Sequence, residues 1–395
     1  MKTAVVGGGA AGFFLAVCLK EQMPRMQVTI FERNQRVLAK VAVSGGGRCN
    51  LTNSFAHVAD LARVYPRGHR LLKRLFHEFD HVSAHKWFEA HGVDLVTQAD
   101  DCVFPASQSS QTVIDCLTST ARRLGVRMET GRPIHSLDEL GDFDFVALTT
   151  GGQPSMKGLQ WLADIGHRVE PPVPSLFTFS VKGLDKLMGI VANQAAVHIP
   201  GTKFSACGPL LITHWGMSGP AILRLSSQAA RLLAEADYRM PLTVNWTGEN
   251  EAQTGERLLE STMRLAQRQL TTVSPLALPQ RLWEHIVARA GVRRDVRWNE
   301  MNRKELHRLV NTLANDRYDI VGRAPFRDEF VTCGGISLRS IHPHSLESRV
   351  RPGLFFAGEL LDIDGVTGGF NFQAVWTTAF CAAKAIASRA EQESI

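Results

Sequence analysis

The chain opens with a short run of apolar residues, 3–6, followed by a glycine-rich turn and a longer apolar stretch, 10–22. A second short apolar run, 27–31, ends at the acidic residue Glu32. Short apolar runs bounded by turn residues are typical of buried strands, whereas a longer apolar stretch favours a helix. The pattern therefore predicts strand, turn, helix and strand, the start of an α/β fold with a parallel sheet.

The middle of the chain follows a different pattern. The proline-rich stretch 171–174 is interpreted as a hinge, and a helix is predicted from 220 to about 236 because Pro220 suits a first helical turn. From about 251 to 319, apolar residues recur at three- and four-residue spacing, which predicts amphipathic helices. Strands are predicted from apolar segments at 177–181, 195–198, 210–213 and 241–246. These changes indicate an insertion between two parts of one domain.

The last part of the chain returns to the first pattern. Strands are predicted to resume near Phe330, and the apolar run 354–357 ends in Gly358-Glu359. A glycine-rich turn then opens a predicted helix from near Gly369 to about Ala387. Both ends of the chain therefore carry a strand, a glycine turn and a helix.

The first glycine turn, Gly7-Gly8-Gly9-Ala10-Ala11-Gly12, matches the pattern GxGxxG. Gly7 permits the tight turn, Gly9 lets a pyrophosphate approach the backbone, and Gly12 lets the helix pack against the strand. The helix start offers free N–H groups and a partial positive charge to phosphates. Glu32 can accept hydrogen bonds from a ribose. The motif predicts a dinucleotide site, but its spacing does not distinguish NAD from FAD.

Three further segments favour FAD. The polar loop 40–53 carries several glycines and Arg48, which can neutralise a pyrophosphate. The strand 145–148 leads into Gly151-Gly152 and would return the chain to the cofactor. In the third segment, 353–373, Glu359 or Asp362 could bond a ribityl hydroxyl, and the helix start would face the flavin. The residues expected to contact the cofactor are Gly7, Gly9, Ala10, Ala11, Gly12, Glu32, Arg33, Lys40, Ser44, Gly45, Gly46, Arg48, Cys49, Asn50, Thr150, Gly151, Gly152, Gly358, Glu359, Asp364, Gly368, Gly369, Phe370 and Asn371.

Four motifs in this order, at 44–53, 213–220, 331–336 and 357–365, resemble those of the BaiN/YhiN-like flavoproteins, also described as aminoacetone-oxidase-like. The resemblance runs nearly end to end. It implies FAD as cofactor, and a GxGxxG-type, glutathione-reductase-like FAD domain formed by both chain ends. After Gly152 the chain departs from the family pattern, because a short segment, 153–158, leads directly to the next helix. The implied division is an FAD-binding first part at 1–175, a β-barrel-like insert at 176–250, a helical insert at 251–322 and an FAD-binding second part at 323–395.

Composition adds few constraints. The formal net charge of +6 is mild and scattered, which favours anionic small molecules and argues against a nucleic-acid partner. Seven cysteines without a CxxC pair indicate neither a disulfide framework nor a metal site. No run of about eighteen apolar residues occurs, so no membrane span is predicted and a cytoplasmic location is expected.

The predicted function is FAD-dependent redox of a small organic molecule, with hydride passing between the substrate and flavin N5. His214 and Trp215, in a glycine-flanked turn, are the candidate catalytic residues, although a purely structural turn explains them equally well. NAD(P)H is a candidate transient electron donor. An oxidase of a small amine that yields peroxide, an RNA-associated flavoprotein and a regulatory flavin binder without turnover remain alternatives. Cys49 and Cys333 could be redox thiols, but small packing residues are the simpler account. Substrate and oligomeric state stay open.

Overall fold

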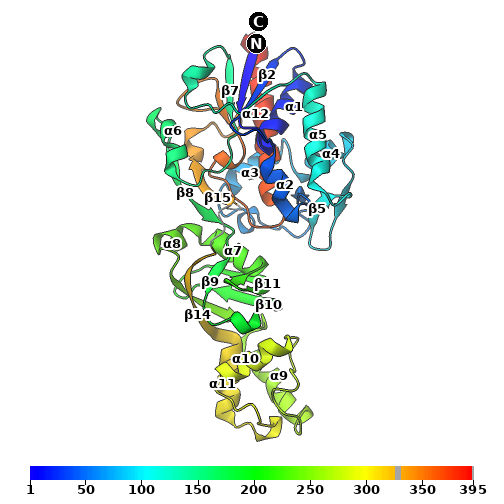
Figure 1. Cartoon of the computed structure of the whole chain (residues 1–395), viewed down its shortest axis with the longest axis vertical. Helices are drawn as coiled ribbons and strands as arrows, with labels where there is room; N and C mark the ends of the chain where they lie inside the picture. Colours follow the sequence, from blue (N-terminus) through cyan, green and yellow to red (C-terminus); the bar gives the residue numbers. More distant parts are fainter. Residues whose placement is uncertain (325–330, 394–395) are drawn as a thin grey trace. The chain divides into compact units, whose positions relative to one another are not determined.

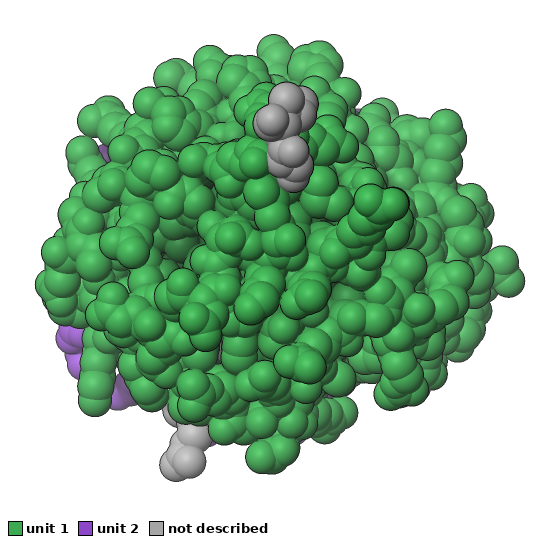
Figure 2. Space-filling model, turned by 90° about the horizontal axis from the view of Figure 1, so that it is seen from above, with its two compact units in different colours: residues 1–174, 331–395 green, residues 175–330 purple. Residues whose placement is uncertain are grey.

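The computed structural model describes residues 1–324 and 331–393. Within these ranges the chain forms two compact units, one from Met1–Pro174 with Val331–Ile395 and the other from Ser175–Phe330. Figure 2 shows the first unit as one continuous body, although the chain leaves it and later returns. Phe330, where strands are predicted to resume, lies outside the described residues, as do residues 394–395.

The first unit is built on a parallel sheet with the strand order β16-β7-β1-β2-β6. The central strand pairs on both sides, so that Thr3 lies opposite Val28 and opposite Phe145. Its side chains from Thr3 onward are buried, which explains the unbroken apolar run in the sequence. The strands are β1 (Lys2–Val6), β2 (Gln27–Glu32), β6 (Arg127–Thr130), β7 (Phe145–Leu148) and β16 (Leu354–Phe356). The predicted α/β fold with a parallel sheet is confirmed.

Two helices from opposite ends of the chain pack against each other in this unit, α1 (Ala10–Gln22) and α12 (Phe370–Glu393) (Figure 1). Phe14 of α1 contacts Trp376 of α12, with ring centroids 5.1 Å apart. The predicted helix over 10–22 is confirmed, and α12 extends past the predicted end. The other helices of the unit are α2 (Ala39–Val43), α3 (His69–Leu75), α4 (His81–Ala90), α5 (Ser110–Arg123) and α6 (Gln160–Asp164).

Two small sheets complete the first unit. One has the order β3-β5-β4, and the other pairs β15 with β8. The proline-rich stretch interpreted as a hinge lies within β8 and is therefore a strand. Proline is tolerated there because an edge strand need not donate all its N–H groups. The strands are β3 (Thr52–Asn53), β4 (Leu95–Thr97), β5 (Cys102–Pro105), β8 (Val169–Ser175) and β15 (Val331–Ile336).

The second unit contains a closed barrel with the order β10-β11-β12-β9-β14-β13. Two helices, α7 (Pro220–Gln228) and α8 (Ala230–Glu235), replace the single helix predicted for this stretch. The strands are β9 (Phe179–Val181), β10 (Val191–His198), β11 (Ser205–Thr213), β12 (Gly216–Ser218), β13 (Met240–Asn245) and β14 (Asp316–Arg323).

The helical segment follows β13 and consists of α9 (Glu251–Arg264), α10 (Gln280–Arg289) and α11 (Arg303–Asn315). Trp283 and Trp298 stack in its core, with ring centroids 6.0 Å apart. The sequence places residues 251–322 in one helical insert, but β14 belongs to the barrel. Its alternation of buried Tyr318 and Ile320 with exposed Arg317 and Asp319 is the period of a strand. Among the described helices, none is long and apolar enough to cross a bilayer.

Candidate functional site

The turn between β1 and α1 has the geometry that a dinucleotide motif requires. Gly7 has a φ of +116°, which favours glycine. A Cβ at Gly12 would lie 2.0 Å from the Gly7 carbonyl oxygen, so only glycine fits there. A Cβ at Gly9 would meet no described heavy atom within 4 Å, and no described side chain caps this end of α1. Ala10 and Ala11 form the first helical turn. The N–H groups at the start of α1 are therefore accessible to a phosphate.

Glu32 lies at the end of β2, beside this turn. Its carboxylate accepts hydrogen bonds from the backbone N–H groups of Gly8 (2.8 Å) and Asn34 (2.9 Å). The carboxylate is thus fixed next to the glycine turn and remains partly exposed, as a ribose partner must be. Arg33 next to it is exposed.

Glu32→Ala is expected to weaken FAD binding by roughly 1–3 kcal/mol, the range of a hydrogen bond to a charged group. The matched control is Glu129→Ala, because Glu129 is an exposed carboxylate opposite Phe31 on the neighbouring strand β6. Titration of each apoprotein with FAD, followed by flavin fluorescence, measures the difference. An equal loss in both variants would show that Glu32 acts only through overall charge.

The loop after α2 has a backbone that only glycines adopt easily. Gly45, Gly46 and Gly47 have φ values of 56°, 68° and 85°, and side chains at Gly46 and Gly47 would meet no described atom within 4 Å. Arg48 stacks over the Phe104 ring at 4.3 Å and donates to the Gly45 carbonyl (3.2 Å). Ser44 donates to the Val41 carbonyl (2.8 Å). These contacts hold the loop in place, and the space beside Gly46 and Gly47 stays open.

The same loop is bonded to the glycine turn before α12. Asn53 donates to the Gly368 carbonyl (3.0 Å), and Thr52 donates to the Gln373 side chain (2.6 Å). With its amide oxygen toward Gly369, Asn50 accepts from that N–H (3.2 Å). A Cβ at Gly369 would lie 2.1 Å from the Thr52 carbonyl oxygen. The structure thus joins glycine-rich segments from the two ends of the chain.

Glu359 also contacts several segments that lie far apart in the sequence. Its carboxylate forms an ion pair with Lys40 (2.8 Å) and accepts from the Thr332 backbone N–H (2.9 Å). A Cβ at Gly152 would lie 2.6 Å from the Glu359 carboxylate, and one at Gly358 would lie 2.8 Å from the Ala11 Cβ. Glu359 therefore links α2, the segment after β7 and β15, and the neighbouring Gly358 packs against the start of α1. Thr150 and Gly151 precede Gly152 in this cluster, and the Thr150 side chain is exposed. Sequence reasoning did not assign Thr332, although it lies in the motif 331–336.

Asp364 has a different environment from the one expected for a cofactor ligand. Its side chain is buried and forms an ion pair with Arg67, which donates from Nε and Nη2 to the two carboxylate oxygens. Asn371 bonds both backbone groups of Gly365 (2.8 and 2.9 Å), and Tyr65 donates to the Phe370 carbonyl (2.8 Å). These side chains shape the turn before α12. Arg67 and Tyr65 were not predicted, because nothing in the local sequence links them to a segment about 300 residues away.

The cysteines near the site are poor redox groups. Burial raises the pKa of the Cys49 thiol to about 12, despite a hydrogen bond with Ser44 that lowers it. Cys333 is also buried, and all seven cysteines of the described residues are free. A thiol with so high a pKa stays protonated at neutral pH and is a weak nucleophile. The simpler interpretation of Cys49 as a packing residue is therefore favoured.

At neutral pH we expect one thiol, that of exposed Cys207, to react rapidly with a disulfide reagent. Burial raises the pKa of Cys102 and Cys116 to about 11 and that of Cys381 to about 12, so these thiols should react only after unfolding. Thiol titration of the native protein and of Cys207→Ser checks this. Rapid modification of Cys49 would contradict the buried assignment.

His214 and Trp215 occupy the turn between β11 and β12 of the second unit. Both are exposed, their rings lie 4.5 Å apart, and Trp215 N–H donates to the Thr213 hydroxyl (3.2 Å). No hydrogen bond of the His214 imidazole occurs among the described residues. A catalytic role for the pair stays a prediction.

The polar groups of the first unit are suited to binding FAD. Free N–H groups at the start of α1, the open Gly9, the Glu32 carboxylate and the glycine loop 44–47 are the groups that a flavin dinucleotide requires. Fold and site define a Rossmann-type, FAD-binding oxidoreductase.

Residues 1–385 match the family model described as HI0933-like protein Rossmann domain, and the chain belongs to this family. The resemblance inferred from the motifs is thereby confirmed. The chain is 26% identical to the 3-dehydro-bile acid delta(4,6)-reductase of Clostridium scindens, over 98% of this chain and 99% of that protein. It is 27% identical to the ribosomal RNA dihydrouridine synthase of Escherichia coli, over 98% of both chains. The protein of the same name from Haemophilus influenzae is 26% identical over 97% of both chains.

Proposed function

We propose that this protein is an FAD-dependent reductase of a carbon–carbon double bond conjugated with a carbonyl group. The two names found among its relatives describe one kind of chemistry. A delta(4,6)-reductase of a 3-dehydro steroid and a dihydrouridine synthase both saturate a ring double bond in conjugation with a ring carbonyl. The observation that supports the proposal is the joining of the loop 44–53 to the turn before α12, because it brings glycine-rich segments from both chain ends together where FAD would bind.

Each group of this site has a distinct task. The start of α1 would bind the pyrophosphate, and Glu32 would bind the adenosine ribose. The Lys40–Glu359 pair and the Thr332 N–H keep the neighbouring segments in place. The glycines at 368–369 leave the N–H groups before α12 close to the loop. Bound FAD would supply hydride at N5 to the β-carbon of the conjugated system, and a proton from solvent would complete the reduction at the α-carbon. NAD(P)H is proposed as the reductant that visits the site transiently.

The test uses the purified, FAD-loaded protein under anaerobic conditions. NADPH or NADH should bleach the flavin, and adding a 4-en-3-one steroid or a uridine-containing ribosomal RNA fragment should restore the oxidised spectrum. Product analysis should show two added hydrogens across the double bond. These two acceptors separate the small-molecule class from the RNA class, which the mild net charge had argued against.

Two outcomes would contradict the proposal. If oxygen alone reoxidises the flavin rapidly and neither acceptor does so, a peroxide-forming oxidase is the better description. If no donor reduces the bound flavin, the regulatory alternative applies.

A further inference from the structure

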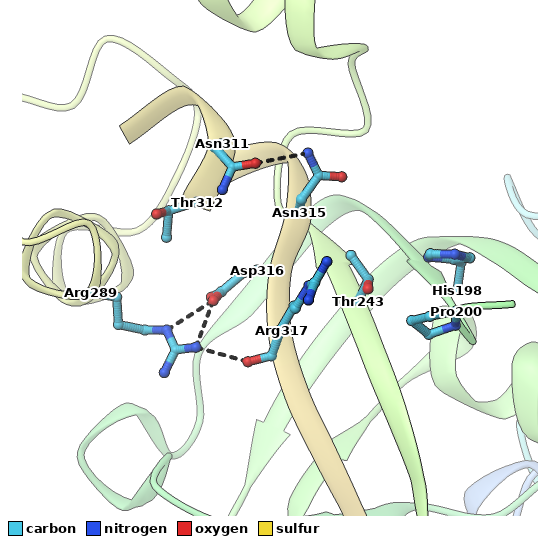
Figure 3. Close-up of a pocket in the computed structure, with 9 residues that line it drawn as sticks. All are labelled: His198, Pro200, Thr243, Arg289, Asn311, Thr312, Asn315, Asp316 and Arg317. Atoms are coloured by element: carbon cyan, nitrogen blue, oxygen red, sulfur yellow. Dashed lines mark hydrogen bonds and ion pairs between the residues drawn. The ribbon is translucent and has the colours of Figure 1, made fainter. Parts of the chain in front are cut away.

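The second unit contains a pocket of about 480 Å³ between barrel strands and the helical segment. It shares no residue with the dinucleotide site of the first unit, and its volume lies in the range of small-ligand pockets. Figure 3 shows the side chains that line it: His198, Pro200, Thr243, Arg289, Asn311, Thr312, Asn315, Asp316 and Arg317.

One wall is a row of donor side chains on three neighbouring strands. His198 of β10 pairs in register with Thr243 of β13, and Thr243 pairs with Arg317 of β14. Side chains alternate along a strand, and the flanking Leu242 and Val244 are buried in the barrel core. The three in-register residues therefore face the outside of the barrel. Figure 3 shows them side by side.

The buried carboxylate of Asp316 holds the guanidinium of Arg289 in the pocket. Asp316 is 3% exposed and accepts hydrogen bonds from Trp246 (2.9 Å), Tyr318 (2.7 Å) and Arg289 (2.9 Å). Arg289 also donates to the Arg317 carbonyl (2.9 Å) and stacks on the Tyr318 ring at 4.5 Å. Asp316 is the one carboxylate among the lining residues, and its acceptor capacity is already used. The positive charges of Arg289 and Arg317 therefore exceed the single negative charge of Asp316.

The opposite wall comes from the end of α11. Asn315 donates weakly to Asn311 (3.4 Å) and to Glu251 of α9 (3.5 Å), and Thr312 donates to the Arg308 carbonyl (2.8 Å). The Leu313 carbonyl at this helix end accepts from the backbone N–H of Trp246 (2.9 Å). The side-chain amides of Asn311 and Asn315 therefore add polar groups beside the wall that carries Arg317 and His198.

We propose that this pocket binds a phosphate ester of about nucleotide size. Arg317 and His198 would bind the phosphate, because a guanidinium donates two parallel hydrogen bonds to phosphate oxygens. Arg317 suits this role because its side chain is exposed and no hydrogen bond or ion pair of that side chain occurs among the described residues. Asn311 and Asn315 would contact the remainder of the ligand. The inference does not depend on the redox reaction.

Calorimetric titration of the FAD-loaded protein with uridine 5′-monophosphate tests this site. The pyrimidine nucleotide is not a fragment of FAD, so the bound cofactor does not compete with it, and any uracil bound beside the flavin would not respond to a substitution at Arg317. Arg317→Gln should weaken binding about tenfold or more, as expected for loss of a charge-assisted bond. His198→Gln should weaken it less. The matched control is Arg239→Gln, because Arg239 is exposed, does not line the pocket and pairs loosely with Asp237 (3.8 Å). This control should bind like the wild type.

Two results would overturn the inference. One is equal affinity for uridine and its monophosphate, because the phosphate would then not be recognised. The other is equal weakening in Arg317→Gln and Arg239→Gln. A further arm separates the source of the phosphate: a single-stranded oligouridylate that displaces the mononucleotide identifies an RNA strand, and failure to displace it identifies a free nucleotide.

Discussion

Gly9→Val is expected to give a folded but colourless protein. The added side chain meets no described atom within 4 Å, and Gly9 has an ordinary φ of −91°, so the fold should accept it. The valine would nevertheless stand at the start of α1, where a pyrophosphate must approach. Losing two hydrogen bonds from backbone N–H groups to a charged oxygen should lower FAD affinity by about 3 kcal/mol or more, roughly a hundredfold. The visible flavin absorbance after purification and an FAD titration measure this.

Two comparisons make the result interpretable. Gly141→Val adds the same side chain at a position of the first unit with a φ of −59° and ordinary contacts (3.6 Å), and should keep its colour. Thermal unfolding of Gly9→Val should match that of wild-type protein stripped of FAD. A yellow Gly9→Val protein would remove the dinucleotide site from this turn.

Asp364→Ala is expected to lower the free energy of unfolding by about 3–5 kcal/mol, because it removes the buried carboxylate that bonds the buried charge of Arg67. The side chain of Asp364 is 0% exposed and that of Arg67 only 15%. Denaturation in urea, followed by circular dichroism on the apoprotein, measures the change without a contribution from the cofactor.

The control is a pair of the same kind on the surface. Lys384 of α12 bonds Glu78 at 2.5 Å, but both side chains are about half exposed. Glu78→Ala should therefore change stability by less than about 1 kcal/mol. If Asp364→Ala lost FAD without losing stability, the cofactor contact expected from the sequence would be the better explanation.

Local signals predicted the elements that carry the cofactor site. The run 3–6, the GxGxxG turn and the helix over 10–22 could be read because each depends on neighbours in the sequence. Contacts between residues far apart in the sequence could not be predicted in this way. Arg67 and Asp364 meet across 297 positions, and neither spacing nor composition relates them.

The second unit shows where periodicity alone misleads. The strand β14 follows directly on α11, and Ala314, Tyr318 and Val321 continue a spacing of four and three residues across the boundary. The apolar alternation in β14 is limited to Tyr318 and Ile320, which are too few positions to overrule the helical pattern before them. Similarly, the three prolines within 171–174 indicate a hinge unless the strand is known to lie at an edge.

The order of strands in the first unit has a consequence for biosynthesis. The edge strand β16 and the helix α12 come from the last part of the chain, yet β16 pairs with β7 and α12 packs on α1. Trp376 also bonds the Leu51 carbonyl across 325 positions. While the ribosome is still making the second unit, the side of α1 that packs on α12 and the edge of β7 that pairs with β16 are uncovered. This exposed intermediate is the stage at which the nascent chain is most prone to aggregate and most in need of a chaperone.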